Sequence, residues 1–344
     1  MTENIITDPQ TVPYFTLATG EHIPAIGMGT FGSDHFEMAD ISAAVAGAID
    51  CGYRLFDCAS VYGNEDLIGD VFQAAFDQGT VKREDLFIMS KVWNDQHRDV
   101  IGAIEKSLKD LHLDYLDAYF MHWPFPNYHA RFATADDRNP DSIPFSLSEF
   151  MDTWYQLEMA QKRGLIRNLG MSSMTIPKLE AVLPLCTVKP TLIELEHHPA
   201  FQQPGLFKYL KDHGITMIGF CPLGSPTRPE RDKTPNDVVD MKMPELVAIA
   251  KAHNVHPALV CLKWAVQRGV IPIPFSIYPA EYQSNLRSVT EDPLTAEEMN
   301  IMASINKNDR FIKGEVFLWQ GSVDWRDLWD EEGVITAGPT FPLD

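Results

Sequence analysis

Short apolar runs alternate with segments of helical periodicity along most of this chain. The clearest helical segment, residues 146–164, places Phe150, Trp154 and Leu157 on one face, begins with serines and ends in Lys-Arg-Gly. Eight apolar runs have the length and composition of buried strands, namely residues 25–30, 54–60, 86–92, 115–122, 166–172, 191–197, 216–222 and 270–276. The pattern predicts strands that alternate with helices.

This alternation leaves few possible topologies. Strands joined by helical crossovers are parallel, so the two simplest arrangements are a closed (β/α)8 barrel and an open doubly wound sheet. The first apolar run ends in GMGTFGSD, residues 27–34, which lacks the GxGxxG spacing of open nucleotide-binding sheets. The eight runs therefore favour an α/β fold of the TIM-barrel type.

Three segments fall outside the regular alternation. Residues 13–24 have the pattern of a β-hairpin that turns at a Thr-Gly pair, and they follow an N-terminal tail of residues 1–12. Residues 125–147 and 308–344 are longer than ordinary connections, and in a barrel both would lie over the catalytic mouth, as lids or as solvated decoration. We expect one domain over residues 13–344, with its last segment as a C-terminal lid.

Composition and charge exclude several classes of function. Of 344 residues, 45% are hydrophobic and 22% are charged, as in ordinary globular proteins. The 28 basic and 48 acidic residues give a net charge of −20, which disfavours binding to nucleic acid or to an anionic membrane. The absence of a leader pattern and of a long apolar run predicts a cytoplasmic protein. The 5 cysteines include no CxxC pair, so we expect reduced, mostly buried thiols and no metal site.

Four polar residues stand at the ends of three consecutive predicted strands. Asp57 ends the second run, Tyr62 follows it, Lys91 ends the third run and His122 ends the fourth. Each alone could be structural, but the carboxyl ends of barrel strands meet at one mouth, where catalytic residues lie. A phenol has a pKa of about 10, which a neighbouring ammonium lowers. The set predicts proton donation by Tyr62, with Lys91 lowering its pKa, Asp57 holding Lys91 charged, and a neutral His122 orienting a carbonyl oxygen.

The motifs together resemble the aldo-keto reductase family over nearly the whole chain. They are GYRLFDCASVYGNE, IMSKVW, FMHWP, EHHP, CPLGSP and IPFS, in the order of the family. The pattern looks closest to the aldose and xylose reductase branch of carbohydrate metabolism. The resemblance implies reduction of a sugar or other small aldehyde or ketone by NADH or NADPH in a monomer or homodimer. The resemblance also implies that Tyr62 is the general acid, that Lys91 and Asp57 adjust its pKa, and that His122 positions the substrate carbonyl.

The resemblance also implies a dinucleotide bound across the barrel mouth. Its expected contacts are Gly29, Thr30, Phe31, Asp57, Ser172, Ser173, Glu194, Phe220, Cys221, Pro222, Leu223, Ser225, Ile273, Phe275, Ser276, Glu281 and Asn285. Three positions near the nicotinamide depart from the family pattern, since Ser173 replaces an asparagine, Glu194 a glutamine and Phe220 a tyrosine. Glu194 can still accept a hydrogen bond from the carboxamide, and Phe220 keeps an aromatic face for stacking.

Two further departures concern the adenosine end. Phe275 replaces a lysine and Glu281 an arginine, so the cations that would meet the 2′-phosphate of NADPH are missing. An acidic residue suits ribose hydroxyls instead, which predicts a preference for NADH. Alternatively, Arg228, Arg231 or Lys233 from the preceding loop restores NADPH binding.

Aromatic residues dominate the expected substrate contacts, which are Phe31, Trp93, His122, Trp123, Phe317 and Trp319. Two other functions use the same fold. One is a non-catalytic, cofactor-binding regulatory relative, and the other is a barrel aldolase or isomerase whose Lys91 forms a Schiff base. The intact set of four polar residues favours the reductase.

Overall fold

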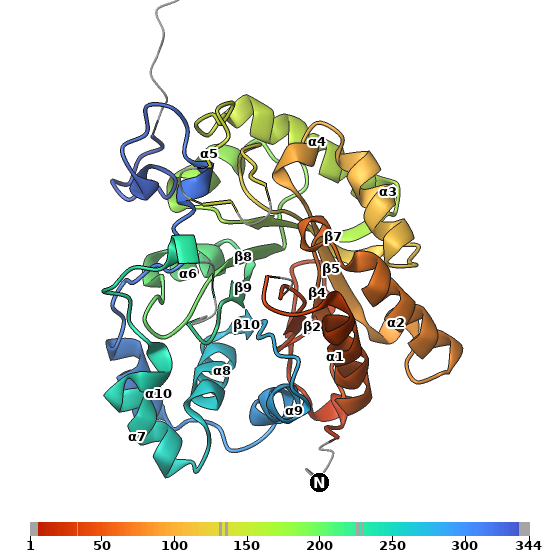
Figure 1. The fold of residues 1–344 in the computed structure, drawn as a ribbon, viewed down its shortest axis with the longest axis vertical. Coiled ribbons are helices and arrows are strands. Elements are labelled where there is room, and N and C mark those ends of the chain that lie inside the picture. Colours follow the sequence, from red (N-terminus) through yellow and green to blue (C-terminus); the bar gives the residue numbers. More distant parts are fainter. Residues whose placement is uncertain are drawn as a thin grey trace, which may run out of the picture.

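The computed structural model describes residues 6–32, 34–130, 133–134, 137–224, 228 and 230–336. Within these residues the central sheet has eight parallel strands that pair in chain order (Figure 1). They are β3 (Met28–Gly29), β4 (Leu55–Asp57), β5 (Phe87–Val92), β6 (Leu116–Met121), β7 (Ile166–Ser172), β8 (Leu192–Glu196), β9 (Thr216–Phe220) and β10 (Val270–Pro272). The Gly27 N–H donates to the Pro272 carbonyl at 3.0 Å, which joins the last strand to the first. The predicted (β/α)8 barrel is confirmed.

An antiparallel hairpin precedes the barrel, as predicted. Strand β1 (Tyr14–Thr16) pairs with β2 (His22–Pro24), and Gly20 in the turn has a φ of +87°. The helices surround the sheet (Figure 1). They are α1 (Met38–Cys51), α2 (Glu65–Asp77), α3 (Val100–Asp110), α4 (Leu147–Lys162), α5 (Ile176–Val182), α6 (Pro204–Asp212), α7 (Pro244–Ala252), α8 (Pro257–Arg268), α9 (Pro279–Ser288) and α10 (Ala296–Ser304).

The barrel has an inner and an outer apolar layer. Alternate strand residues such as Leu55, Met89 and Phe120 fill the interior, because side chains of a strand point to opposite faces in turn. Their neighbours in sequence pack outward against the helices. On β7, a Cβ on Gly170 would lie 2.2 Å from the Phe120 ring, so only glycine lets this ring occupy the interior.

A third apolar cluster lies beyond the C-terminal ends of the strands. Trp93 and Trp123, which follow β5 and β6, pack there against Phe317 and Trp319 of the C-terminal segment. The amide of Asn127 also donates to the Phe317 carbonyl at 2.8 Å. The described parts of residues 125–147 and of the C-terminal segment therefore meet over the mouth of the barrel, and the latter continues beside α5 (Figure 1).

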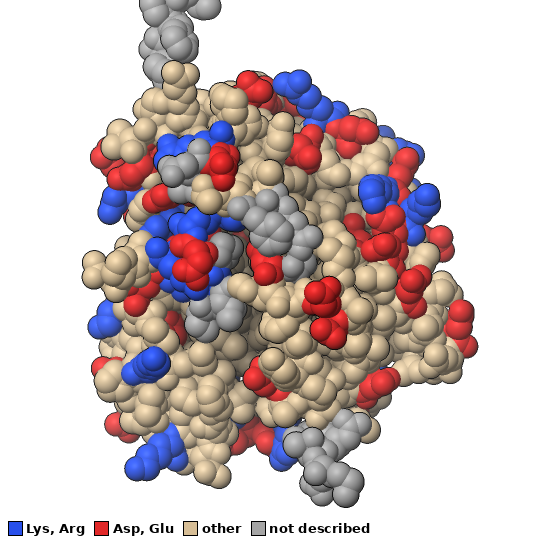
Figure 2. Space-filling model, in the orientation of Figure 1, with Lys and Arg blue, Asp and Glu red and all other residues tan. Residues whose placement is uncertain are grey.

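The surface charge and the buried, free cysteines agree with what the sequence predicts. Acidic side chains are spread across the face seen in Figure 2, as the net charge of −20 requires. Four cysteines are buried, Cys221 is partly buried, and all are free thiols. None of the described helices is long and apolar enough to span a bilayer. The described residues also hold no group of three or more His, Cys, Asp or Glu suited to a metal ion.

Candidate active site

The inward-facing rows of the barrel end in polar side chains at its mouth. Asp57, Lys91, His122 and Glu194 each stand two residues after an inward-facing apolar residue, so the strand period directs them to the same side. Those apolar residues are Leu55, Met89, Phe120 and Leu192. The alternation that fills the barrel thus also places the candidate catalytic groups.

Lys91 is the centre of this constellation and is fully buried. Its Nζ lies 2.5 Å from Asp57 Oδ1, 3.1 Å from the Cys58 carbonyl oxygen and 3.3 Å from the Tyr62 hydroxyl. A second carboxyl oxygen, Oε1 of Glu194, lies 3.4 Å from the same Nζ. The predicted trio of Asp57, Tyr62 and Lys91 does meet, and Glu194 joins it, whereas the sequence placed Glu194 only at the cofactor amide.

Hydrogen bonds from the connecting loops hold these strand ends together. The Thr30 hydroxyl donates to the Asp57 carbonyl at 2.8 Å, and the Asn64 amide donates to the Thr30 carbonyl at 3.0 Å. The Ser60 hydroxyl donates to the Lys91 carbonyl at 3.1 Å. The loop that carries Tyr62 is therefore tied to the two strands that carry its partners.

Burial and neighbouring charges together determine the charge states of Tyr62 and Lys91. Burial raises the pKa of Tyr62, and Lys91 lowers it by less, so the net shift is upward and the expectation of a lowered pKa is wrong. Burial lowers the pKa of Lys91, but the Asp57 carboxylate and the other acidic groups around the ammonium outweigh this and raise the pKa well above its usual value. At neutral pH the site thus holds a protonated phenol beside an ammonium.

His122 is a neutral imidazole in this setting, as predicted. Burial, followed by the charge of Lys91, lowers the pKa of its ring well below the usual value. The ring meets Tyr62 and Trp93 edge-on, with centroids 6.0 Å and 5.0 Å apart. Its Nδ1 is buried and has no hydrogen-bond partner in the described part of the chain.

Glu194 carries the strongest departure from ordinary carboxylate behaviour at the mouth. Burial and the nearby Asp57 carboxylate raise its pKa to about 8. Both carboxyl groups lie against the Lys91 ammonium, and Oε2 of Glu194 is buried without a donor among the described residues. The sequence does show an acid at position 194 where the family has a glutamine. It does not show how near this side chain lies to Lys91, because that distance depends on the curvature of the barrel.

The remaining predicted cofactor residues line the same end of the barrel. Those that the structure describes at or after strand ends are Gly29, Phe31, Ser172, Ser173, Phe220, Cys221, Pro222, Leu223 and Ile273, while Asn285 is buried in α9. Ser225 lies outside the described residues. Ser173 has a φ of +57°, a left-handed conformation that asparagine adopts more readily than serine.

The segment after β10 is aromatic and acidic. Phe275 covers Gly32 so closely that a Cβ there would lie 2.4 Å from the ring. Phe36 packs against the same ring at a centroid distance of 6.0 Å. The Ser276 hydroxyl donates to Glu281 Oε2 at 2.7 Å, which directs this carboxylate toward the start of α9.

The three cations that were alternatives for a 2′-phosphate site have protein partners in this structure. The pairs are Arg228 with the Asp237 carboxylate, Arg231 with the Ala133 carbonyl oxygen, and Lys233 with the Glu230 carboxylate. Arg228 also lies over the Phe311 ring, 4.1 Å from its centroid. Each of these cations is thus held by at least one protein group in this structure.

Aromatic side chains form the rim above the polar cluster. The rings of Trp93 and Trp123 lie 5.9 Å and 4.5 Å from the ring of Phe317, and Trp319 belongs to the same cluster. Phe31 lies on the other side, 5.1 Å from the Tyr62 ring, and is 43% exposed. His129, which sequence reasoning missed, contacts both Trp93 and Phe317 through its ring.

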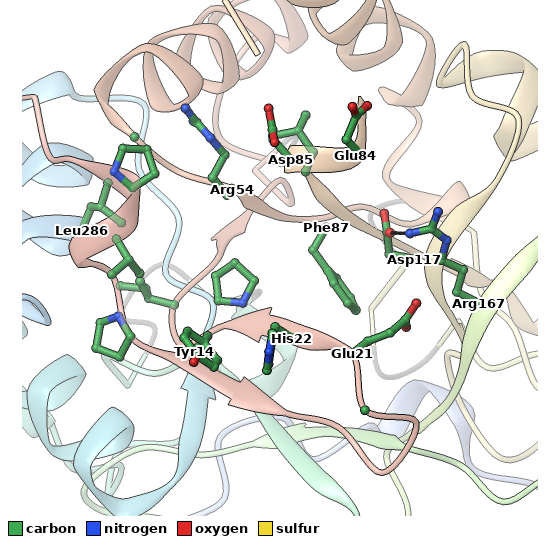
Figure 3. A pocket seen from close by; sticks show the side chains of 18 residues that line it. Tyr14, Glu21, His22, Arg54, Glu84, Asp85, Phe87, Asp117, Arg167 and Leu286 are labelled. Atoms are coloured by element: carbon green, nitrogen blue, oxygen red, sulfur yellow. Dashed lines mark hydrogen bonds and ion pairs between the residues drawn. The ribbon is translucent and has the colours of Figure 1, made fainter. Parts of the chain in front are cut away.

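A cavity of about 380 Å³ lies at the opposite end of the barrel, beneath the hairpin (Figure 3). Residues of the hairpin and of the N-terminal strand ends line it, including Tyr14, Glu21, His22, Arg54, Phe87 and Asp117. It contains none of the predicted site residues. The cavity therefore does not belong to the candidate active site.

Comparisons with known proteins agree with the geometry. The model of the aldo/keto reductase family matches residues 25–307. Aldo-keto reductase family 1 member A1 of Xenopus tropicalis is 39% identical over 309 residues, covering 88% of this chain and 91% of the relative. An aldo/keto reductase of Synechocystis is 37% identical over 328 residues, covering 93% and 97%. The crystal structure of a Bombyx mori aldo-keto reductase in complex with NADP superposes with a TM-score of 0.77 at 30% identity, covering 88% of this chain and 95% of that one.

Proposed function

This chain belongs to the aldo/keto reductase family, and we propose that it reduces an aldehyde or ketone to the alcohol with a nicotinamide dinucleotide. The observation that carries the proposal is the contact of the Tyr62 hydroxyl with Lys91 Nζ at 3.3 Å, while Asp57 pairs with the same ammonium at 2.5 Å. A buried phenol with this support is suited to give a proton to a developing alkoxide.

The mouth of the barrel has residues that fit the cofactor. A bound dinucleotide supplies the two electrons of the reduction. Ser172 and Glu194 are the polar groups for its carboxamide, and the buried Oε2 of Glu194 has an open acceptor position there, with no donor among the described residues. Phe220 offers an aromatic face to the ring. The Bombyx mori relative was solved in complex with NADP, which supports a nicotinamide cofactor for this chain.

Each side chain of the constellation has a distinct part in the reaction. Tyr62 gives its proton to the carbonyl oxygen as negative charge develops there, and the ammonium of Lys91 stabilises the phenolate that remains. Asp57 holds that ammonium in place at 2.5 Å. His122 is neutral, so its N–H donates to the carbonyl oxygen without adding a charge that would compete with Lys91.

The charge state of Lys91 argues against a Schiff-base aldolase. Amine attack on a carbonyl needs the neutral amine, and the Asp57 carboxylate together with the other acidic groups around Lys91 raises its pKa well above the usual value. Borohydride treatment with an aldehyde should therefore leave Lys91 unmodified. A stable adduct at Lys91 would instead support the aldolase.

We further propose a preference for NADH over NADPH. Phe275 covers Gly32 and Glu281 accepts a hydrogen bond from Ser276, so an aromatic ring and an anion occupy the segment expected at the adenosine end. The cations of the preceding loop, among them Arg228 and Lys233, are paired elsewhere. A 2′-phosphate would meet Glu281 without a neighbouring cation, whereas ribose hydroxyls would donate to it. Equal or better kcat/KM with NADPH would contradict this preference.

The rim favours a small carbonyl compound with an apolar or ring face. Trp93, Trp123 and Phe317 surround the approach to His122 with aromatic surface, on which the C–H faces of a sugar also pack. A sugar aldehyde, as in the xylose reductase branch, and a simple aldehyde both meet this description. Comparing kcat/KM for xylose, glyceraldehyde and an aromatic aldehyde ranks these classes.

The deciding experiment measures the oxidation of NADH or NADPH by the fall in absorbance of the reduced cofactor. It compares wild type with Tyr62→Phe on the three aldehydes named above. Loss of the proton donor should lower kcat by about 10² to 10⁴ with cofactor affinity unchanged, while Tyr155→Phe, exposed on α4, serves as a matched control. A Tyr62→Phe enzyme that keeps a tenth of the rate contradicts the assignment. Tight cofactor binding by wild type without turnover of any aldehyde would favour the non-catalytic regulatory relative.

A further inference from the structure

Four acceptors surround the Lys91 ammonium, which has only three N–H donors. They are Asp57 Oδ1 at 2.5 Å, the Cys58 carbonyl oxygen at 3.1 Å, the Tyr62 hydroxyl at 3.3 Å and Glu194 Oε1 at 3.4 Å. The ion pair with Asp57 and the backbone carbonyl take two donors. In this structure the third donor goes to the Tyr62 hydroxyl, and Glu194 Oε1, at ion-pair distance from the same Nζ, is the alternative acceptor for it.

The outcome of this competition depends on the proton of Glu194. A charged acceptor forms a stronger hydrogen bond with an ammonium than a neutral hydroxyl does, so an ionised Glu194 would take the third N–H from Tyr62. A neutral carboxylic acid is a weaker acceptor and leaves this N–H to the phenol. The side chain that determines where Lys91 points is thus on β8, across the barrel from the strand of Lys91.

The surroundings of Glu194 favour the neutral acid. Its side chain is 4% exposed, its Oε2 has no donor among the described residues, and its carboxyl group and that of Asp57 lie against the same ammonium. Two carboxyl groups that share a buried site cannot both ionise without a large cost. Asp57 lies nearer to the ammonium, so it keeps the charge and Glu194 keeps the proton.

The groups that face Glu194 are few. Within the described residues, the titratable ones are Asp57 on β4, Lys91 on β5 and Tyr62 after β4. Its partners in the neighbouring strands, Ser172 on β7 and Ile218 on β9, do not titrate. Its protonation is therefore coupled directly to the three groups of the proposed proton-transfer site.

We propose that Glu194 is a positioning residue that supports carbonyl reduction only while it carries its proton, an inference that rests on the function proposed above. Ionisation of Glu194 would draw Lys91 away from Tyr62. It would also place a second negative charge beside a phenol that must become a phenolate when it gives up its proton. Both effects slow the reduction, so the carboxyl group acts as an alkaline switch inside the site.

The expected pH dependence follows from the pKa of Glu194, which burial and Asp57 raise to about 8. The protonated fraction then falls from roughly nine-tenths at about pH 7 to roughly one-tenth at about pH 9. If the ionised form is inactive, kcat/KM for reduction, which reports groups of the free enzyme, should fall about tenfold over this interval. The fall should have the slope of a single titrating group.

The variant Glu194→Gln tests the switch because it keeps the shape and cannot ionise. Its kcat/KM profile should lack the alkaline fall, so the ratio of kcat/KM at about pH 9 to kcat/KM at about pH 7 should rise roughly tenfold over wild type. The matched control is Glu332→Gln, the same chemical change at an exposed position of the C-terminal segment. Its profile should follow wild type.

A second measurement does not depend on turnover or on the folding of a variant. In wild type labelled with carboxyl ¹³C-glutamate, one glutamate resonance should titrate near pH 8, far above an ordinary value of about 4.3. If every glutamate titrates below about pH 6, the proposal is overturned, and it is equally overturned if Glu194→Gln keeps the alkaline fall. If wild type reduces no carbonyl at all, the proposed function fails, while the NMR titration still decides whether Glu194 keeps its proton.

Discussion

Glu196 fastens the C-terminal segment to the barrel, and its replacement by glutamine gives the most direct test of that role. The buried carboxylate accepts the Phe311 N–H at 2.6 Å and the Ile312 N–H at 2.8 Å. It also contacts His198 Nε2 at 3.0 Å, and His198 pairs on its other side with Asp240 at 2.9 Å. Burial raises the pKa of Glu196, but His198 and these donors outweigh it and lower the pKa below its usual value. The group is therefore ionised at neutral pH.

Glutamine cannot satisfy the same three donors. Its single amide oxygen can accept at one side, while its NH2 group would face another donor, either a backbone N–H or the His198 ring. Hydrogen bonds to charged groups are worth about 1.5–3 kcal/mol each, and breaking a buried ion pair costs about 3–5 kcal/mol. His198 retains Asp240 in the variant, which limits the loss. We expect Glu196→Gln to lower the free energy of unfolding by about 3–5 kcal/mol.

Denaturant unfolding monitored by tryptophan fluorescence measures this loss, and hydrogen exchange locates it. The Phe311 and Ile312 amides should exchange faster in Glu196→Gln, and KM for the aldehyde should rise because Phe317 of the rim follows in the same segment. Glu332→Gln, which changes an exposed carboxylate of the segment, should leave both quantities unchanged. A loss below about 1 kcal/mol with unaltered exchange at Phe311 would refute the fastening role.

Two more predictions concern the cofactor and a second attachment of the C-terminal segment. The double variant Phe275→Lys/Glu281→Arg should favour NADPH more than wild type does. The ratio of kcat/KM with NADPH to kcat/KM with NADH should rise by at least about tenfold, or roughly 1.4 kcal/mol. An unchanged ratio would show that this segment does not meet the 2′-phosphate. Lys178→Met should lower the free energy of unfolding by about 3–5 kcal/mol, because it leaves the buried Asp330 carboxylate, now 2.5 Å from Lys178 Nζ, without its cation. Denaturant unfolding of this variant beside Lys178→Met/Asp330→Leu checks it, since the double variant should recover part of the loss.

Most of the barrel could be predicted because its strands are buried on both faces and therefore continuous in apolar character. The ends were less predictable. Residues 25–30 and 270–276 were expected as strands, but regular pairing covers only Met28–Gly29 and Val270–Pro272. Pro272 and Pro274 have no N–H to donate. At the junction between the first and last strands, Gly27 and Gly29 donate to the Pro272 and Pro274 carbonyl oxygens, and these prolines donate nothing in return.

In the candidate site, the sequence pattern predicts some contacts between side chains and not others. Strand-end positions sufficed to bring Asp57, Tyr62 and Lys91 together, because all carboxyl ends of the strands meet at one mouth. The contact between Lys91 and Glu194 joins β5 to β8 across the barrel, and it depends on the tilt of strands that are not neighbours. The net pKa of Tyr62 depends on complete burial, which no local pattern reports.

Two buried glutamates on one strand show how strongly the protein surroundings determine charge. Glu194 and Glu196 both point inward from β8, two residues apart, and both are almost completely buried. Glu194 faces the Asp57 carboxylate and has one oxygen without a donor among the described residues, so its pKa rises to about 8. Glu196 receives two backbone N–H groups and the His198 ring, so its pKa falls. Desolvation raises the pKa of both carboxyl groups. The hydrogen-bond donors around Glu196 outweigh this and lower its pKa, whereas Oε2 of Glu194 lacks a donor among the described residues. Because the strand period directs both side chains to the same face, two residues of one strand supply the neutral acid that we propose for the reaction site and the ionised carboxylate that holds the C-terminal segment.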